Sequence, residues 1–284
     1  MVFSGCTFSI ANNLVKKYRV KMSSQLLGRK EILRGLLKAS PLWSLLKSAK
    51  VFVLRLYLRR ILHNFSGSSI TSEGVGQIEL AKLCDKYGSD KGSSKKLDHN
   101  YPWKPHSYTD FYEFMFSHRR FEIDTIFECG VGTSDLNFPA NMGVFGKAGA
   151  SLRVWQEYFP QALIYGGDID SSVLFSEGRI KTYYLDQTDP NSIVSFFHLT
   201  AQDEFDLMID DGLHTFEAGW SLFNHSNHLL KQGGVYIIED VRPSTMNKFL
   251  EIDFSSMGFS VHPVLFKGEN GALDLSTLLI LVKT

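Results

Sequence analysis

The strongest constraint on the fold is a repeated pattern in the carboxyl-terminal three quarters of the chain. Short apolar runs, each ending at or beside an acidic residue, alternate with stretches of helical spacing such as residues 150–159. Such alternation predicts a parallel sheet that is covered by helices on both faces. The acids then meet at one edge of the sheet, which is the edge where open α/β sheets bind ligands. The five runs are residues 123–129, 162–169, 179–185, 205–209 and 234–238.

Two further apolar runs, residues 259–266 and 277–283, read as a hairpin across residues 268–272. We therefore expect an α/β, Rossmann-like fold with a seven-stranded, mostly parallel sheet, helices on both faces and an antiparallel terminal hairpin. This domain is assigned to residues 71–284.

Residues 1–70 differ from the rest in charge. They hold 13 of the 30 Lys and Arg residues and one of the 30 Asp and Glu residues, so they carry a formal charge of +12 and the remainder carries −12. Residues 28–65 show helical spacing interrupted by Pro41, and residues 65–76 read as a Ser- and Gly-rich linker. The longest strictly apolar stretch of the second helical run, residues 51–54, is far below the ~20 residues that span a bilayer. A basic helical extension and linker is predicted.

Two interpretations of residues 28–65 stay open. One is a basic amphipathic helix on an anionic membrane surface. The other is a helical hairpin that packs on the domain or on a partner subunit of a homo-oligomer. Nucleic-acid binding is not expected, because the basic residues are interleaved with Leu. Three scattered cysteines and no secretory signal favour a reducing, cytoplasmic location, with peripheral contact to the inner face of the membrane under the first interpretation.

A glycine turn follows the first run, with Gly130 and Gly132 placed to let the backbone approach a ligand. The third glycine of a dinucleotide pattern is replaced by Asp135, and an acid there would repel a pyrophosphate. A cofactor without phosphates fits better. Asp168 can accept hydrogen bonds from ribose hydroxyls, and the residues after the third run can meet an adenine edge. These features suit S-adenosylmethionine, which has a positive sulfonium and an unphosphorylated adenosine.

The stretch IDDGLH ends the fourth run in Asp210 and Asp211, with His214 close behind. It is either a polar turn that caps a strand or a site that binds a metal and moves protons. The second interpretation is favoured because Glu239 and Asp240 end the neighbouring run. Asp210 serves the cofactor or caps the strand.

Eight stretches carry a resemblance to a known family: KYGSDKG (86–92), HSYTDFYE (106–113), FECGVG (127–132), GASLRVW (149–155), YGGDID (165–170), LDQTD (185–189), IDDGLH (209–214) and LLKQGGVYIIEDV (229–241). Together they resemble class I S-adenosylmethionine-dependent methyltransferases. Within these, the chain is similar to the metal-dependent sugar O-methyltransferases of macrolide and rhamnosyl pathways and to the related cephalosporin hydroxylases. The resemblance covers roughly residues 80–245. The loop at 133–148 departs from it, as does Leu213 where the family often has Ser or Ala.

The resemblance implies roles for ten residues. The cofactor turn is formed by Glu128, Gly130 and Gly132, with Asp168 at the ribose and Asp186 and Gln187 at the adenine. A magnesium ion is held by Asp211, Glu239 and Asp240, and His214 is the general base. The alternative for His214 is a hydrogen bond to a metal-binding carboxylate. Lys86 and Lys91 are expected to pair with acids on the rim, and Trp155 is expected in the core.

These roles imply an S-adenosylmethionine- and Mg²⁺-dependent O-methyltransferase that acts on a sugar hydroxyl of a glycosylated metabolite or surface glycan. Magnesium prefers oxygen ligands and lowers the pKa of a bound hydroxyl, while a neutral imidazole accepts the proton. Two alternatives are an oxidising enzyme of the cephalosporin-hydroxylase kind and a non-catalytic partner protein with this fold.

Overall fold

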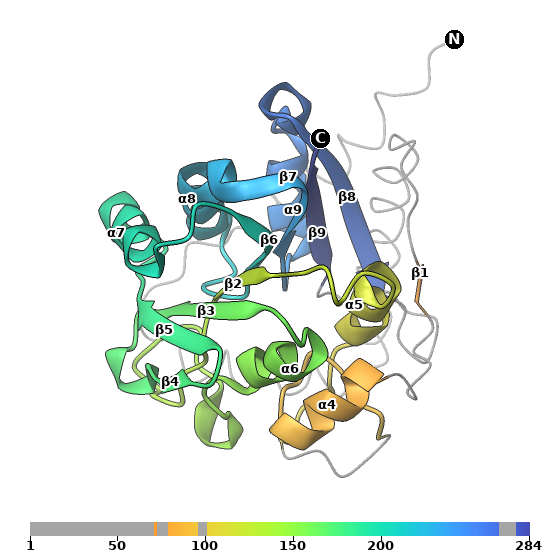
Figure 1. Cartoon of the computed structure of the whole chain (residues 1–284), viewed down its shortest axis with the longest axis vertical. Coiled ribbons are helices and arrows are strands. Elements are labelled where there is room, and N and C mark those ends of the chain that lie inside the picture. The colour runs from red at the N-terminus through yellow and green to blue at the C-terminus, as the bar shows by residue number, and fades with distance from the viewer. Residues whose placement is uncertain (1–70, 73–78, 96–100, 267–276) are drawn as a thin grey trace, which may run out of the picture. The chain divides into compact units, whose positions relative to one another are not determined.

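The computed structural model describes residues 71–72, 79–95, 101–266 and 277–284 (Figure 1). Within these residues nine strands form one sheet in the order β1-β8-β9-β7-β6-β2-β3-β5-β4. The strands are β1 (Thr71–Ser72), β2 (Thr125–Cys129), β3 (Leu163–Asp168), β4 (Ser176–Glu177), β5 (Ile180–Tyr184), β6 (Phe205–Asp210), β7 (Leu230–Ile238), β8 (Phe259–Phe266) and β9 (Leu278–Lys283).

The predicted α/β sheet is confirmed. The five runs that end in acids become β2, β3, β5, β6 and β7, and they pair in parallel. Strands β8 and β9 pair with each other in the antiparallel direction, and β9 also pairs with β7. The two strands that the sequence did not predict, β1 and β4, have two residues each, which is too short to show a periodic pattern.

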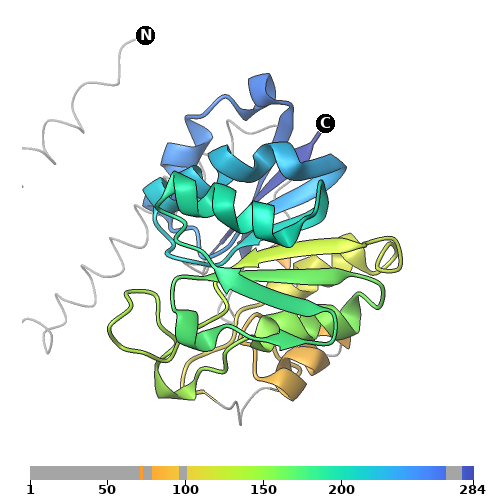
Figure 2. The same ribbon diagram turned by 60° about the vertical axis from the view of Figure 1, so that its left-hand side comes forward.

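Helices cover both faces of the sheet. Helices α4 (Glu79–Tyr87), α5 (Tyr108–Phe116) and α6 (Ala150–Tyr158) lie on one face, and α7 (Pro190–Thr200), α8 (Phe216–Ser226) and α9 (Pro243–Leu250) lie on the other (Figures 1 and 2). Short 3₁₀ helices are η2 (Gly143–Phe145), η3 (Ser171–Val173), η4 (Asn227–Leu229) and η5 (Phe254–Met257).

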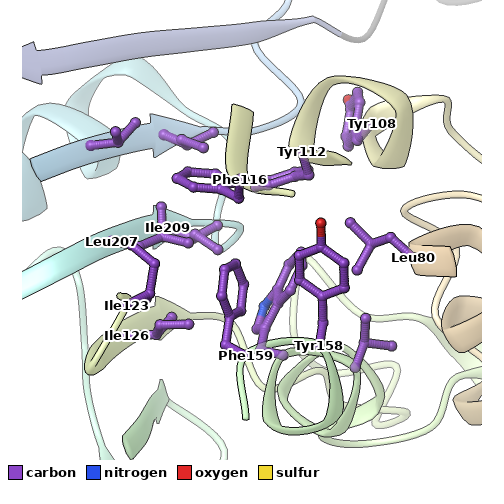
Figure 3. Close-up of a cluster of buried hydrophobic side chains, with 14 of the residues drawn as sticks. Leu80, Tyr108, Tyr112, Phe116, Ile123, Ile126, Tyr158, Phe159, Leu207 and Ile209 are labelled. Carbon is purple, nitrogen blue, oxygen red and sulfur yellow. The ribbon is translucent and has the colours of Figure 1, made fainter. Parts of the chain in front are cut away.

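The core has two layers because the side chains of each strand alternate between the faces. On β2, Ile126 points to the α4–α6 layer and Phe127 to the α7–α9 layer. In the first layer, Phe116 of α5 packs against Phe159, the residue after α6, and Tyr112 of α5 packs against Trp155 of α6 (Figure 3). Every residue of β2 and β6 is buried, as expected for strands that are covered on both faces.

Local capping fixes where the helices begin beside the sheet edge. The Asp189 side chain accepts a hydrogen bond from the backbone N–H of Asn191, and Pro190 opens α7 with its preset φ. The Thr215 hydroxyl accepts a hydrogen bond from the N–H of Ala218 and so caps α8. Because Thr215 directly follows IDDGLH, this cap fixes the downstream end of that turn.

The position of β2 creates a topological switch point. It lies between β3, where the chain goes next, and β6, which begins the other half of the sheet. Beyond the first residues of these loops, the chain runs from β2 to α6 on one face of the sheet and from β6 to α8 on the other. The edge of the sheet at such a switch point is where ligands bind.

Two predicted segments lie outside the described residues: the basic helices within 28–65 and the turn at 268–272. Among the helices that the structure describes, none combines the length and apolar character needed to cross a bilayer.

Candidate active site

The glycine turn after β2 packs directly against the turn after β6. Gly130 and Gly132 adopt φ values of +94° and +95°, which are strained for residues that carry a Cβ. A Cβ on Gly130 would lie 2.2 Å from the carbonyl oxygen of Asp211. The Asp211 N–H in turn donates to the carbonyl of Cys129 at 3.0 Å. The two predicted motifs are thus brought into contact.

Asp168, the predicted ribose ligand, braces this turn. Its Oδ2 accepts hydrogen bonds from the N–H groups of Val131 and Gly132, at 2.8 and 3.0 Å. Its Oδ1 accepts one from the N–H of Asp170 at 2.9 Å. The carboxylate is 8% exposed, and Asp168 lines the cavity beside the turn.

A cavity of about 660 Å³ opens at this edge of the sheet, within the range of ligand pockets in proteins. Of the ten predicted site residues, all except Glu128 line it. The loop at 133–148 contributes an apolar wall through Phe138, Met142 and Phe145. One continuous space therefore joins the predicted cofactor turn to the predicted metal ligands.

At the predicted adenine end, two side chains are already engaged. Asp186 Oδ1 accepts hydrogen bonds from the N–H and hydroxyl of Thr188, at 2.8 and 2.6 Å. The Gln187 side chain reaches away from its own loop to the turn after β6, where it contacts Asp210 and Leu213. The structure thus places both residues at the cavity while giving each of them internal partners.

A buried lysine lies at the centre of the carboxylates. Lys91 is 3% exposed, and its Nζ lies 2.6 Å from Asp211 Oδ2, 2.5 Å from Glu239 Oε2 and 3.4 Å from Glu128 Oε1. The expected pairing of Lys91 with acids is confirmed, although inside the protein rather than on an exposed rim. Lys86 also pairs with an acid, Glu157 on α6, but at the surface.

The surroundings of this cluster decide its charges. Burial by itself would lower the pKa of the Lys91 ammonium, but Asp211, Glu239 and Glu128 outweigh it and raise that pKa well above its usual value. Burial raises the pKa of the Glu128 carboxyl, and burial together with the charges of Asp211 and Glu128 raises the pKa of the Glu239 carboxyl well above its usual range. Lys91 opposes both rises. The cluster is therefore an acid-rich site that contains its own cation.

A second group of side chains lies on the cavity side of Lys91. Asp211, His214 and Asp240 each offer one ligand atom, and these atoms lie within 4.8 Å of one another, which makes the group able to hold a metal ion. His214 Nε2 is 4.0 Å from Asp211 Oδ1 and 3.9 Å from Asp240 Oδ2. His214 and Asp240 have left-handed φ values of +56° and +51°, a conformation that non-glycine residues adopt mainly at constrained sites.

The sequence placed the metal on Asp211, Glu239 and Asp240. The structure brings these three carboxylates to one corner, but both oxygens of the Glu239 carboxylate have partners. Lys91 donates to Oε2, and the Tyr112 hydroxyl donates to Oε1. The side chain that offers a ligand atom close to those of Asp211 and Asp240 is His214.

Three aromatic contacts with the carboxylates were missed from sequence. The indole N–H of Trp155, which lies in the core as expected, donates to Glu128, and the hydroxyl of Tyr112 donates to Glu239. The Tyr108 hydroxyl donates to Asp240 Oδ1 at 2.6 Å. Tyr108 and Tyr112 are four residues apart on α5, so they share a helix face, and that spacing is the signal that could have indicated their common role.

Comparison with known proteins finds relatives in sequence and in fold. No family model matches the chain. Similar curated proteins are an 8-demethyl-8-alpha-L-rhamnosyl tetracenomycin-C 2'-O-methyltransferase of Streptomyces olivaceus, 35% identical over 58% of this chain and 38% of that protein, and a demethylmacrocin O-methyltransferase of Streptomyces fradiae, 33% identical over 48% and 32%. The chain thus spans less than two fifths of the length of these relatives.

Solved structures agree on the fold. MycE methyltransferase of the mycinamycin pathway, in complex with Mg and SAH, superposes with a TM-score of 0.52 and 23% identity over 72% of this chain and 54% of that chain. The chain therefore has the class I S-adenosylmethionine-dependent methyltransferase fold and is related in sequence to the sugar O-methyltransferases of macrolide and tetracenomycin pathways.

Proposed function

We propose that this protein is an S-adenosylmethionine-dependent O-methyltransferase that requires Mg²⁺ and methylates a sugar hydroxyl. The observation that carries the proposal is the single cavity that connects the glycine turn after β2 with the Asp211, His214 and Asp240 cluster. The sequence relatives, whose names describe methylation of sugars on natural products, support the same chemistry.

The cofactor is assigned to the part of the cavity next to the glycine turn. Gly130 and Gly132, which follow Glu128, line this part of the cavity. Asp168 would face the ribose, and the loop that holds Asp186 and Gln187 would meet the adenine. The structural fit is that both glycines and Asp168 line the cavity, whereas side chains at Gly130 and Gly132 would displace the neighbouring turn and Met142. Bound S-adenosylmethionine supplies an electrophilic methyl group, and the protein supplies orientation.

The metal is assigned to Asp211, Glu239 and Asp240. The donor set fits a hard cation, because the carboxylate oxygens that Mg²⁺ prefers converge at one corner of the cavity. Both oxygens of the Glu239 carboxylate already have partners, Lys91 at Oε2 and Tyr112 at Oε1, so a bound ion would compete with them for that carboxylate. Bound Mg²⁺ would lower the pKa of an acceptor hydroxyl.

His214 is assigned the departing proton. Its Nε2 is the basic atom within about 4 Å of both Asp211 and Asp240, so it lies beside the proposed metal corner. A neutral imidazole at this place would accept the proton of an acceptor hydroxyl.

The test uses the full chain with labelled methyl donor, Mg²⁺ and a panel of glycosides and glycans. We expect transfer to a sugar hydroxyl that EDTA abolishes and that falls at least ~100-fold, the range of general acid–base catalysis, in Asp211→Asn and His214→Ala. Absence of SAH binding by calorimetry would contradict the whole proposal. Transfer that EDTA leaves unchanged would contradict only the metal.

The cofactor site has a matched control pair of glycines. Gly130→Ala introduces a methyl group 2.2 Å from the Asp211 carbonyl, whereas Gly233, at φ +73°, has no atom within 4 Å of an added Cβ. We expect Gly130→Ala to weaken SAH binding at least tenfold and Gly233→Ala to leave it unchanged. Equal effects would show that the glycine turn is not the cofactor site.

The acceptor is proposed to be a glycosylated metabolite or a surface glycan. The +12 charge of residues 1–70 supports a peripheral location at the inner face of the membrane, through residues 28–65, and the alternative is packing in a homo-oligomer. Cosedimentation with anionic liposomes, comparing the intact chain with a form that lacks residues 1–70, decides between them. Equal binding by both forms would remove the membrane proposal.

A further inference from the structure

Gln187 reaches across the sheet edge to the turn after β6. It follows β5, but its side chain is 7% exposed and ends against residues 23 and 26 positions further along the chain. Its Nε2 donates to Asp210 Oδ1 at 3.1 Å, and its Oε1 accepts from the N–H of Leu213 at 2.6 Å. Both ends of the amide therefore bind the same turn.

This turn needs support from outside itself. His214 adopts a left-handed φ of +56°, which is unfavourable for a residue with a Cβ. Its neighbour Leu213 is held through its N–H by Gln187, and the Gly212 N–H donates weakly to Asp210 Oδ1 at 3.3 Å. A Cβ on Gly212 would lie 1.9 Å from Gln187 Oε1, so the glycine makes room for this contact.

We infer that Gln187 is a positioning residue: its side chain holds the turn that presents Asp211 and His214 rather than recognising adenine. The amide that would meet an adenine edge is oriented by its two partners, because the donor faces a carboxylate and the acceptor faces a backbone N–H. Asp210, whose role the sequence left open, is the buried anchor of this contact. The catalytic consequence rests on the proposed function, whereas the structural role does not.

Hydrogen exchange tests the structural role without any ligand. In Gln187→Ala the Leu213 N–H loses its acceptor, so a peptide covering residues 209–216 is expected to exchange at least tenfold faster. The matched control is Gln202→Ala. Gln202 lies just before β6, at the end of that strand away from the turn, and its side-chain amide donates to the hydroxyl of Tyr165 on β3. Equal exchange of residues 209–216 in wild type and Gln187→Ala would overturn the inference.

Ligand binding then separates positioning from adenine recognition. We expect Gln187→Ala to weaken Mn²⁺ binding, measured by electron paramagnetic resonance, by about 10- to 100-fold, as for residues that orient metal ligands. The Kd for SAH, measured by calorimetry, should change less than about threefold. A loss of SAH affinity as large as the loss of Mn²⁺ affinity would overturn the inference. Failure of wild type to bind SAH would instead contradict the proposed function and leave the exchange result valid.

Exchanging the amide and the carboxylate between positions 187 and 210 distinguishes loss of this contact from general misfolding. Gln187→Glu keeps the acceptor for Leu213 but loses the donor to Asp210, and it places two carboxylates together. Combining it with Asp210→Asn lets the asparagine donate to the new carboxylate. We expect the double variant to recover most of the Mn²⁺ affinity and exchange protection lost in Gln187→Glu. No recovery, with both variants folded by circular dichroism, would overturn the inference.

Discussion

At the residue scale, Lys91 connects the carboxylates of the site. It is buried with three carboxylates, two of which, Glu128 and Glu239, are almost fully inaccessible. A buried charge is tolerated when opposite charges and hydrogen bonds compensate it. The positive charge of Lys91 thus compensates the negative charges of these buried acids and allows them to cluster in a folded core.

Lys91→Met is expected to lower the free energy of unfolding by about 3 kcal/mol or more, because removal of one partner leaves buried charges uncompensated. Urea denaturation measures the change. The control is Lys86→Met in the same KYGSDKG stretch, where the lost ion pair with Glu157 is exposed and screened by solvent, so a much smaller change is expected. Similar losses in the two variants would contradict the compensating role of Lys91.

At the element scale, the start of β6 is tied to both neighbouring strands through Asp206. Its Oδ2 accepts hydrogen bonds from the N–H groups of Asp124 and Thr125, at 2.9 Å each, and from Lys231 Nζ at 2.9 Å. Burial by itself would raise the pKa of the Asp206 carboxyl, but these donors outweigh it and hold the pKa below its usual value. This end of the sheet is opposite to the site, so it reports on the scaffold alone.

Because the folded pKa of Asp206 is lowered, its contribution to stability is present above the unfolded pKa of about 3.9 and is lost as the pH falls through the folded value. Asp206→Asn is therefore expected to lower the free energy of unfolding at pH 7 by about 1–3 kcal/mol, with a difference from wild type that shrinks below about pH 4. Urea denaturation between pH 7 and pH 2.5 measures it. Asp203→Asn removes the same charge at an exposed position three residues earlier and should show neither effect.

At the scale of the whole molecule, the cavity spans the switch point and contacts both halves of the sheet. The glycine turn and the loops after β3 and β5 belong to one half, and the turns after β6 and β7 belong to the other. A ligand that binds there contacts both halves and favours the folded state by mass action.

SAH and Mg²⁺ are each expected to raise the melting temperature, with about 2.7 kcal/mol of stabilisation for a ligand present at 100 times its Kd. Differential scanning fluorimetry measures both increments. Asp211→Asn should lose the Mg²⁺ increment and retain that of SAH, because the proposed function assigns this carboxylate to the metal and not to the cofactor. Retention of both increments would contradict the assignment of Asp211.

The sequence by itself determined the class of fold and the edge of the sheet at which polar groups gather. Apolar runs that alternate with helical stretches specify a covered parallel sheet, and the carboxyl ends of parallel strands share one edge, so local patterns sufficed for both. The two-residue strands β1 and β4 could not be predicted, because so short a segment carries no period.

Only the tertiary structure decided which groups meet. It placed the Lys91 ammonium between Asp211 and Glu239, which lie 120 and 148 residues away, and it brought the amide of Gln187, at the wall of the cavity, to Asp210. Such partners come from different elements, and their meeting depends on how α5, the loops and the sheet pack together. Sequence spacing reports neighbours within an element, but the pairing of charges between elements is set by the shape of the packed core.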